Sequence, residues 1–354
     1  MVSKKRRDYG KVILLSIFLL LCILVSASVG SASLTIWESL KVLVAKIPMV
    51  KRLVASDSMG AMYEVIIWKV RMPRILQAAL VGGSLAVVGC TFQAIFRNAL
   101  ADPHILGISS GASLGATIGM MSGVTVHFLG LGVTSIFAFI GAILTVGIVY
   151  QLGTLGRRMV VTHVLLVGTA MSTFLSAMIS LLMIFHREQI EKVYLWTLGS
   201  FNAANWYKVS YMTVVGIVGI GIIWIFARDL NVLITGDEVA ASLGIEILKV
   251  KKLLIMIASL LVAASVSISG AIGFVGLIIP HCMRLLLGAD HRRLIPVCAL
   301  GGASFMVLCD TLARTIAAPT EIPVGVITAI FGAPYFIFLL YRDTKRGSYR
   351  KEMG

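Results

Sequence analysis

Residues 97–115 read RNALADPHILGISSGASLG, a polar turn that runs directly into a helix of small residues. The turn is dense in Asn, Asp and Pro, which favour turns and need water or a protein partner for their polar groups. Pro103 suits the first turn of the helix, and Asp102 before it can cap free N–H groups. Two overlapping GxxxG steps follow, at Gly111, Gly115 and Gly119. Because GxxxG lets a neighbouring helix approach closely, the stretch predicts tightly packed membrane helices.

The composition around this stretch supports the same interpretation. The 354 residues have a mean hydropathy of +0.96 and are 58% hydrophobic, but only 13% are charged. A soluble domain carries about 25% charged residues. The apolar residues fall in blocks of about 20, the length that crosses ~30 Å of hydrocarbon as a helix. The sequence therefore predicts an all-α polytopic membrane protein.

We expect ten membrane-spanning helices in a single domain that covers residues 1–354. Their approximate ranges are 12–30, 72–95, 103–121, 130–152, 162–185, 207–227, 251–269, 272–288, 294–315 and 322–341. An even count puts both termini on one side of the membrane. The first span also has the outline of a cleaved signal peptide, but a polytopic chain can retain it as a start signal.

The basic residues set the expected orientation. Most of the 31 Lys and Arg fall at the termini and in the loops on the terminal side, so the positive-inside rule makes both termini cytoplasmic. The net charge of +15 then reflects this bias and attraction to anionic lipid, rather than nucleic-acid binding.

No sequence pattern points to catalysis or to a metal site. The chain contains no phosphate-binding GxxxxGK[ST], no HExxH and no cluster of carboxylates in the spans. None of the five cysteines forms a CxxC pair, so we expect small core residues rather than disulfides or metal ligands; they are Cys22, Cys90, Cys282, Cys298 and Cys309. The sequence thus predicts no catalytic residue and no bound cofactor.

Charged residues near the outer ends of the spans allow two interpretations each. Asp310 and Arg314 share a helix face, which favours a local ion pair over a proton-relay role for the acid. Arg71, Arg74 and Arg314 lie at one outer rim. Their guanidiniums could reach lipid phosphate, or they could bind carboxylates of a soluble partner.

The fifth span carries a narrow stripe of hydroxyl side chains, formed by Thr169, Ser172, Thr173, Ser176 and Ser180. At 100° per residue these positions occupy one arc of the helix. Such a stripe could line a wet pathway or seat another helix, and the residues alone do not decide between the two.

The longer loops are few. Ser31–Val70 is expected outside, with an interfacial helix around Ile36–Ile47. The outer loop His186–Lys208 holds aromatics typical of an interfacial belt or of a channel mouth. The inner loop Arg228–Lys252 contains two short helix-like pieces, around Gly236–Leu243 and Ile245–Val250.

Several blocks together resemble a known family. Residues 71–116, RMPRILQAALVGGSLAVVGCTFQAIFRNALADPHILGISSGASLGA, are similar to the signature of the FecCD-type permeases. The likeness continues in GDEVAASLG (236–244), GAIGFVGLIIPHCMRLLLGADHRRLIP (270–296), DTLART (310–315) and EIPVGVITAIFGAPYFIFLL (321–340). It covers about residues 60–341. These permeases are the membrane subunits of type II ABC importers for iron–siderophores, haem and cobalamin.

The resemblance implies partners and roles that the residues alone leave open. It implies a ten-helix subunit in a homodimer, two cytoplasmic ATPase subunits that hold ATP and Mg, and an extracytoplasmic substrate-binding protein. The ATPase-coupling residues would be Gly236, Asp237, Glu238, Ala240, Leu243 and Gly244. Arg71, Arg74 and Arg314 would dock the binding protein. The hydroxyl stripe would line the translocation pathway.

The sequence departs from the family pattern at two positions. A cytoplasmic gate would fall at Val161 and Thr162, although Val161 is not the small hydroxyl residue typical there. Ala99 replaces the usual Pro of the turn, which should relax it slightly.

The implied function is import of an iron complex, a ferric siderophore or haem, across the bacterial cytoplasmic membrane by a non-enzymatic transport subunit. The alternative within the family is a cobalamin importer. A more distant alternative is a secondary transporter driven by an ion gradient, which would need intramembrane acids, and only Asp310 qualifies.

Overall fold

A computed structural model describes residues 2–30, 35, 37, 39–41, 61–124, 127–128, 130–154 and 161–352. Most of the interfacial helix expected around Ile36–Ile47 lies outside these residues. The described chain is mainly helical. The elements of its first half are α1 (Val2–Ser28), α4 (Ala61–Val65), η1 (Ile66–Arg71), α5 (Met72–Ile95), η2 (Pro103–Leu106), α6 (Ile108–Met121), β1 (His127–Phe128), β2 (Leu131–Gly132), α7 (Val133–Gly153) and α8 (Val161–Phe185).

The second half contains helices only among the described residues. They are η3 (Arg187–Gln189), α9 (Ile190–Thr197), α10 (Trp206–Ile225), α11 (Ala227–Leu233), α12 (Asp237–Ser242), α13 (Ile247–Ser269), α14 (Val275–Leu287), α15 (His291–Ala313) and α16 (Val324–Glu352). The two short strands form one antiparallel pair between α6 and α7.

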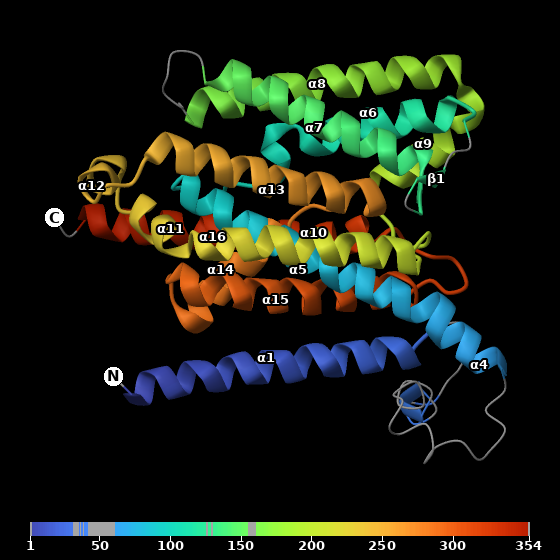
Figure 1. Cartoon of the computed structure of the whole chain (residues 1–354), viewed down its shortest axis with the longest axis horizontal. Helices are drawn as coiled ribbons and strands as arrows, with labels where there is room; N and C mark the ends of the chain where they lie inside the picture. The colour runs from blue at the N-terminus through green and yellow to red at the C-terminus, as the bar shows by residue number, and fades with distance from the viewer. Residues whose placement is uncertain are drawn as a thin grey trace.

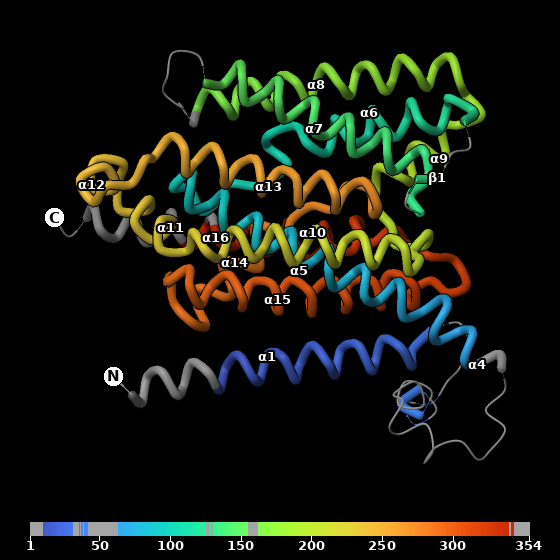
Figure 2. Tube along the Cα trace, in the orientation of Figure 1, coloured from blue at the N-terminus to red at the C-terminus, as the bar shows by residue number. Residues whose placement is uncertain are grey.

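The long helices run roughly along one axis in layers (Figures 1 and 2). α6, α7 and α8 pack on one another at one side, and α1 packs on α15 at the other. Between them α5 contacts α10, α13, α14 and α15. Both chain ends lie at the end of the bundle that carries α12 (Figure 1). We call this the loop end, and the opposite end, where α1 ends and α5 begins, the arginine end.

α5 is the central helix, and 20 of its 24 residues are buried. Its glycines permit this, because side chains there would meet neighbouring backbone. A Cβ atom at Gly89 would lie 2.0 Å from the carbonyl oxygen of Gly276 in α14, and one at Gly82 would lie 2.4 Å from that of Gly302 in α15. α5 can therefore cross α14 and α15 this closely only because glycine, which has no side chain, stands at the crossing points.

The GxxxG steps of α6 face α7 in the same way. A Cβ atom at Gly111 would lie 2.6 Å from the carbonyl oxygen of Gly141, and one at Gly115 would lie 2.1 Å from that of Phe137. At Gly119 the nearest atom would be the Cα of Thr134, at 3.1 Å. Close packing of two backbones accounts for all three glycines.

Seven described helices are long and apolar enough to cross a membrane: α1, α5 with the turns before it, α7, α8, α10, α13 and α15. The other three expected spans fall on shorter elements. α14 has 13 residues and α6 has 14, and the apolar part of α16 is Val324–Leu339. Each expected span thus has a helix, but the count of ten crossings stays a prediction.

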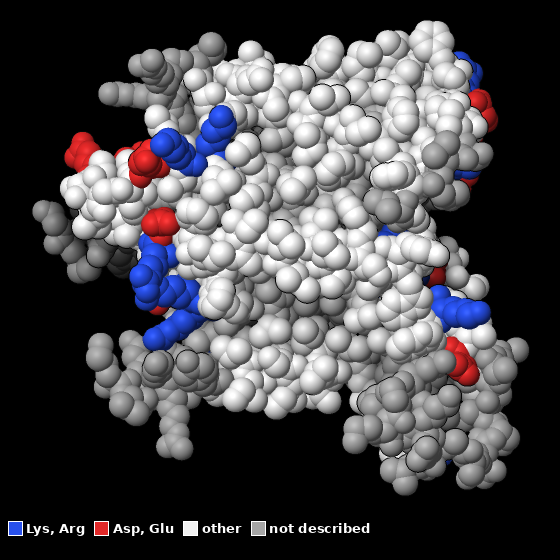
Figure 3. Space-filling model, in the orientation of Figure 1, with Lys and Arg blue, Asp and Glu red and all other residues white. Residues whose placement is uncertain are grey.

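The charged residues are distributed as a membrane protein requires. On the face drawn in Figure 3, Lys, Arg, Asp and Glu gather at the two ends of the bundle, and a broad band without charge separates them. This band runs across the middle of the long helices, where hydrocarbon would surround them.

The third expected span begins later than we predicted. Asp102 accepts a hydrogen bond from the backbone N of His104 at 2.7 Å, as expected of a cap, but Pro103–Leu106 forms a short 3₁₀ turn. Gly107 then adopts φ 72°, a conformation that glycine tolerates, and α6 starts at Ile108.

Candidate functional site

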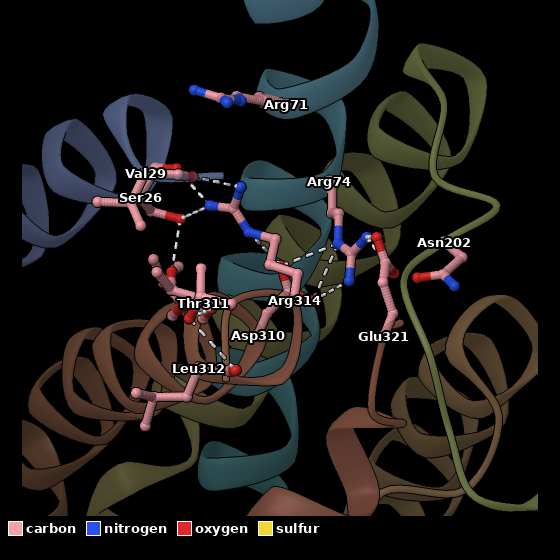
Figure 4. Close-up of polar contacts among 12 residues, drawn as sticks. Ser26, Val29, Arg71, Arg74, Asn202, Asp310, Thr311, Leu312, Arg314 and Glu321 are labelled. Atoms are coloured by element: carbon pink, nitrogen blue, oxygen red, sulfur yellow. Dashed lines mark hydrogen bonds and ion pairs between the residues drawn. The ribbon is translucent and has the colours of Figure 1, made fainter. Parts of the chain in front are cut away.

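At the arginine end, two buried guanidiniums bind the last turn of α1, and Figure 4 shows the contacts of one of them, Arg314. Arg71 donates from Nη1 to the carbonyl oxygens of Ala27 and Ser28, at 2.6 and 3.0 Å. Arg314 donates to the carbonyls of Ser26 and Val29 and to the Ser26 hydroxyl. The last carbonyls of a helix have no partners within it, so these two arginines cap α1.

Arg74 lies beside them and is held by two carboxylates (Figure 4). Its Nε and Nη2 donate to Asp310 at 2.9–3.0 Å, and its Nη1 donates to both oxygens of Glu321 at 2.8 and 3.1 Å. Asp310 is only 1% exposed, whereas Glu321 is 36% exposed. One carboxylate therefore fixes Arg74 from inside the protein, and the other covers it from the surface.

The predicted Asp310–Arg314 ion pair is confirmed, with 3.7 Å between Arg314 Nε and Asp310 Oδ2. Sequence reasoning missed that Arg74 is the nearer partner of Asp310, because the two residues are 236 positions apart. The structure brings Arg71, Arg74, Arg314 and Glu321 around one pocket of about 240 Å³. The docking role of the three arginines stays a prediction, but their side chains are already largely occupied within the chain.

At the loop end, α12 carries both buried and exposed apolar residues. Gly236 before it has φ 135° and Gly244 after it has φ 81°, so both ends of the segment need glycine. Ala240 is fully buried, whereas Val239 and Leu243 are 46% and 65% exposed. The first expected helical piece is thus α12. The second was wrong as a separate helix, because Ile247 already begins α13.

Charged contacts hold α12 in place. Asp237 accepts hydrogen bonds from Lys251 Nζ at 2.9 and 3.0 Å, and its Oδ1 lies 3.5 Å from Arg97 Nη2. The carboxylate therefore joins α12 to α13 and to the turn that follows α5.

A second polar joint at this end links α11 to α15. The Asn231 amide donates to Asp290 at 2.7 Å, and Asn231 Oδ1 accepts from the backbone N of His291 at 2.8 Å. Although burial raises the pKa of Asp290, its hydrogen bonds to Asn231 and Arg292 bring that pKa below the ordinary value. Asp290 thus stays ionised and caps α15.

The hydroxyl stripe of α8 lies on an open side of the chain. Thr169, Thr173, Ser176 and Ser180 are exposed and Ser172 is half-buried. Thr173 and Ser180 donate to backbone carbonyls one turn earlier, which leaves their oxygens able to accept from a neighbour. Of the expected gate, Thr162 is exposed, and Val161 starts the helix but its side chain is outside the described part.

Two polar contacts in the interior had no signal in a single sequence. Gln93 donates to the carbonyl of Gly276 at 3.0 Å and accepts from Arg284. His104 Nε2 lies 2.9 Å from the carbonyl oxygen of Ile272. The Gln93 contacts join α5 to α14, and the His104 contact joins the turn around residues 97–107 to the segment just before α14.

The cysteines lie as expected of core residues. All five are free; Cys22, Cys90, Cys298 and Cys309 are buried and Cys282 is half-buried. Within the part of the chain that the structure describes, no three His, Cys, Asp or Glu side chains meet as metal ligands would.

Comparisons with known proteins agree with this architecture. A model of the FecCD transport family matches residues 18–342. The cobalamin import system permease protein BtuC of Halobacterium salinarum is 43% identical over 277 residues, which are 78% of this chain and 73% of that protein. The hemin transport system permease protein HmuU of Yersinia pestis is 40% identical over 290 residues, 80% and 85% of the two chains. A solved inward-facing ABC transporter of the metal-chelate type shares 31% identity at a TM-score of 0.80, over 94% of this chain and 99% of that one.

Proposed function

Because the chain belongs to the FecCD transport family and is a membrane permease of the ABC importer class, we propose that it imports an iron complex, haem or a ferric siderophore. The observation that carries the proposal is its likeness, over most of both chains, to a permease named for hemin. A second candidate is cobalamin, which the 43% identical relative favours. Both candidates are metal ions held in a large organic chelator.

We propose that the arginine end faces outward and receives a substrate-binding protein. The three arginines and Glu321 gather there around one pocket, and such a charged cluster suits a partner with carboxylates. Arg71 and Arg314 both hold the last turn of α1, so they would stabilise the docking surface rather than contact the partner. Arg74 is the most exposed of the three, at 11%, and its outward contact is the partly exposed Glu321, so it would be the guanidinium nearest to a partner.

We propose that α12 couples the permease to ATP hydrolysis on a separate subunit. Exposed Val239 and Leu243 would pack in a groove of the ATPase, as apolar residues on short helices do in helix-in-groove contacts. Asp237 would pass the movement to α5 and α13 through Arg97 and Lys251. The loop end and both termini would then be cytoplasmic, in the bacterial inner membrane.

We propose that two copies of the chain form the pathway. The exposed hydroxyl stripe of α8 supports this, since exposed hydroxyl groups in a membrane helix call for water or a partner helix. Docking would open the pathway to the outside, and ATP-driven movement of α12 would reorient it. The energy would come from ATP and Mg on the partner ATPase, with no cofactor on this chain.

The test is uptake by the complete complex in proteoliposomes. The permease, its ATPase and its binding protein are assembled with ATP inside, and radioiron-labelled haem, a radioiron siderophore and radiocobalt cobalamin are offered separately. We expect uptake of a radioiron complex only. Uptake of cobalamin alone would replace the first candidate by the second, and uptake that survives a Walker-motif mutation in the ATPase would refute ATP-driven import.

A further inference from the structure

A second cavity at the arginine end has no role in the mechanism above. It measures about 1020 Å³ and lies between the starts of α7 and α10, the end of α13 and the helix α9. Helix α9 lies at the same end of the bundle as the start of α5 in Figure 1, so the cavity is at the arginine end. It is therefore at the level where the membrane helices end.

The charged side chains that line the cavity are all basic. Lys192 and Lys208 line it, and none of its other described lining residues is acidic. Lys208 is 9% exposed, and its Nζ donates one hydrogen bond, of 2.8 Å, to the carbonyl oxygen of Ala203. Among the described residues it forms no ion pair. An ammonium group has three donors, so two remain for a ligand.

A buried ammonium without a carboxylate partner is costly, because burial removes water from the charge and nothing of opposite sign replaces it. The cost is recovered if an anion enters the cavity. Deprotonation of Lys208 would also remove this cost. A neutral Lys208 would not attract an anion, so an anion-binding experiment distinguishes deprotonation from ligand binding.

The uncharged polar residues that line the cavity also suit an anion. Residues with hydroxyl or amide groups that can donate line the cavity; they are Thr134, Ser135, Ser200, Asn202 and Tyr207. The first turn of α10, a helix of 20 residues, also starts at the cavity and adds the positive end of its dipole. Ammonium, hydroxyl and helix N-terminus together are the donors that phosphate oxygens take in proteins.

We propose that this cavity binds a phosphate group, carried by the headgroup of an acidic phospholipid or by inorganic phosphate. The lipid source fits the position, because Trp196 and Tyr207 line the cavity and such aromatics mark the headgroup level. Trp196 lies on α9, whose next residue, Thr197, lines a separate apolar cavity of about 670 Å³ against α16. A bound phosphate thus stabilises the short helix that separates the two cavities.

The experiment measures thermal stability and lipid retention of the detergent-purified chain. One arm adds phosphatidylglycerol, a second adds phosphatidylcholine, and a third adds inorganic phosphate. The variants are Lys208→Met, Lys192→Met and, as a matched control at the loop end, the exposed Lys252→Met. Native mass spectrometry counts the phosphatidylglycerol that each variant retains.

We expect phosphatidylglycerol to raise Tm by several degrees and phosphatidylcholine to have no such effect. Lys208→Met should require at least about tenfold more phosphatidylglycerol for the same shift, Lys192→Met should be intermediate, and Lys252→Met should match the wild type. A shift by inorganic phosphate that also depends on Lys208 assigns the site to the dissolved ion. The proposal is overturned if neither source shifts Tm, or if Lys208→Met and Lys192→Met both respond like the wild type.

Discussion

Arg97 Nη2 lies 3.5 Å from Asp237 Oδ1, which joins the turn after α5 to the first residue of α12. The same carboxylate accepts two hydrogen bonds from Lys251, whose side chain is only 9% exposed. A movement of α12 would therefore act on α13 through the nearly buried Lys251 and, more weakly, on the end of α5, the central helix, through Arg97. This relationship gives the proposed coupling a physical route into the bundle.

Asp237→Asn should uncouple ATP hydrolysis from uptake. The substitution leaves Lys251 nearly buried without a carboxylate, at a cost of about 1–3 kcal/mol in stability, whereas Arg97→Ala removes a half-exposed pair worth about 0–1 kcal/mol. The measurement is the ratio of uptake to ATP hydrolysis in proteoliposomes that contain the full complex. Glu246→Gln, which removes the exposed pair with Lys249, is the control. An unchanged ratio in Asp237→Asn would contradict the route.

Gly89→Ala should destabilise the fold strongly. Its Cβ atom would lie 2.0 Å from the carbonyl oxygen of Gly276, so α5 and α14 must separate, at a cost of roughly 1–3 kcal/mol or more. Gly147→Ala in α7 is the matched control, because nothing lies within 4 Å of its added Cβ. We expect the control to keep or raise the Tm in detergent. Equal Tm values for the two variants would refute the close crossing.

Asp310→Asn should destabilise the arginine end far more than Glu321→Gln does. Asp310 is 1% exposed and holds Arg74 and Arg314, so its neutralisation removes the carboxylate paired with the buried Arg314 and leaves Arg74 with Glu321 alone, at roughly 3–5 kcal/mol. Glu321 is 36% exposed, and its loss should cost about 0–1 kcal/mol. Thermal unfolding of the two variants in detergent checks the order, and a reversed order would show that Asp310 is not the inner anchor.

Ser176→Phe should block uptake without loss of stability. Ser176 is exposed on the open side of α8, so a larger side chain can extend away from the rest of the chain. In the proposed dimer it would enter the pathway. Leu181→Phe, at another exposed position of α8, is the control. Normal uptake by Ser176→Phe would remove the stripe from the pathway.

The sequence predicted the parts of the fold that depend on local pattern. Hydropathy placed a helix at each expected span, and the GxxxG spacing marked the face of α6 that packs on α7, because both signals repeat along one helix. The i, i+4 spacing of Asp310 and Arg314 predicted their ion pair for the same reason.

Contacts between distant segments could not be predicted in this way. Arg74 reaches Asp310 across 236 positions, and Gln93 reaches Gly276 across 183, and neither pair has a periodic signature. The burial of Arg71 and Arg314 was missed as well, because their partners are backbone carbonyls of α1, and every residue has a carbonyl. The charge pattern therefore located the site but did not reveal what occupies its guanidiniums.

Because Arg71 and Arg314 are already bound to carbonyl groups of α1, their substitution is a poor test of docking. A charge reversal at Arg71 or Arg314 would free the last carbonyls of α1, so a loss of uptake would reflect a damaged fold as much as lost docking. Glu321→Gln is a cleaner change, since Glu321 is partly exposed and, among the described residues, its hydrogen bonds come from Nη1 of Arg74.

Glu321→Gln should strengthen binding of the substrate-binding protein. The neutral amide holds Arg74 less tightly, so Nη1 becomes available to a carboxylate of the partner, and we expect an affinity gain of a few fold, about 1 kcal/mol. Surface plasmon resonance with the permease in nanodiscs measures the affinity, and Glu188→Gln, exposed in η3, controls for the loss of one negative charge at this end. Both variants remove one negative charge, but of the two carboxylates only Glu321 is hydrogen-bonded to Arg74 in the described structure. An equal gain in affinity for Glu321→Gln and Glu188→Gln would therefore mean that long-range electrostatics, and not the release of Arg74, strengthens binding. A gain confined to Glu321→Gln would identify Arg74 as the guanidinium that the partner binds.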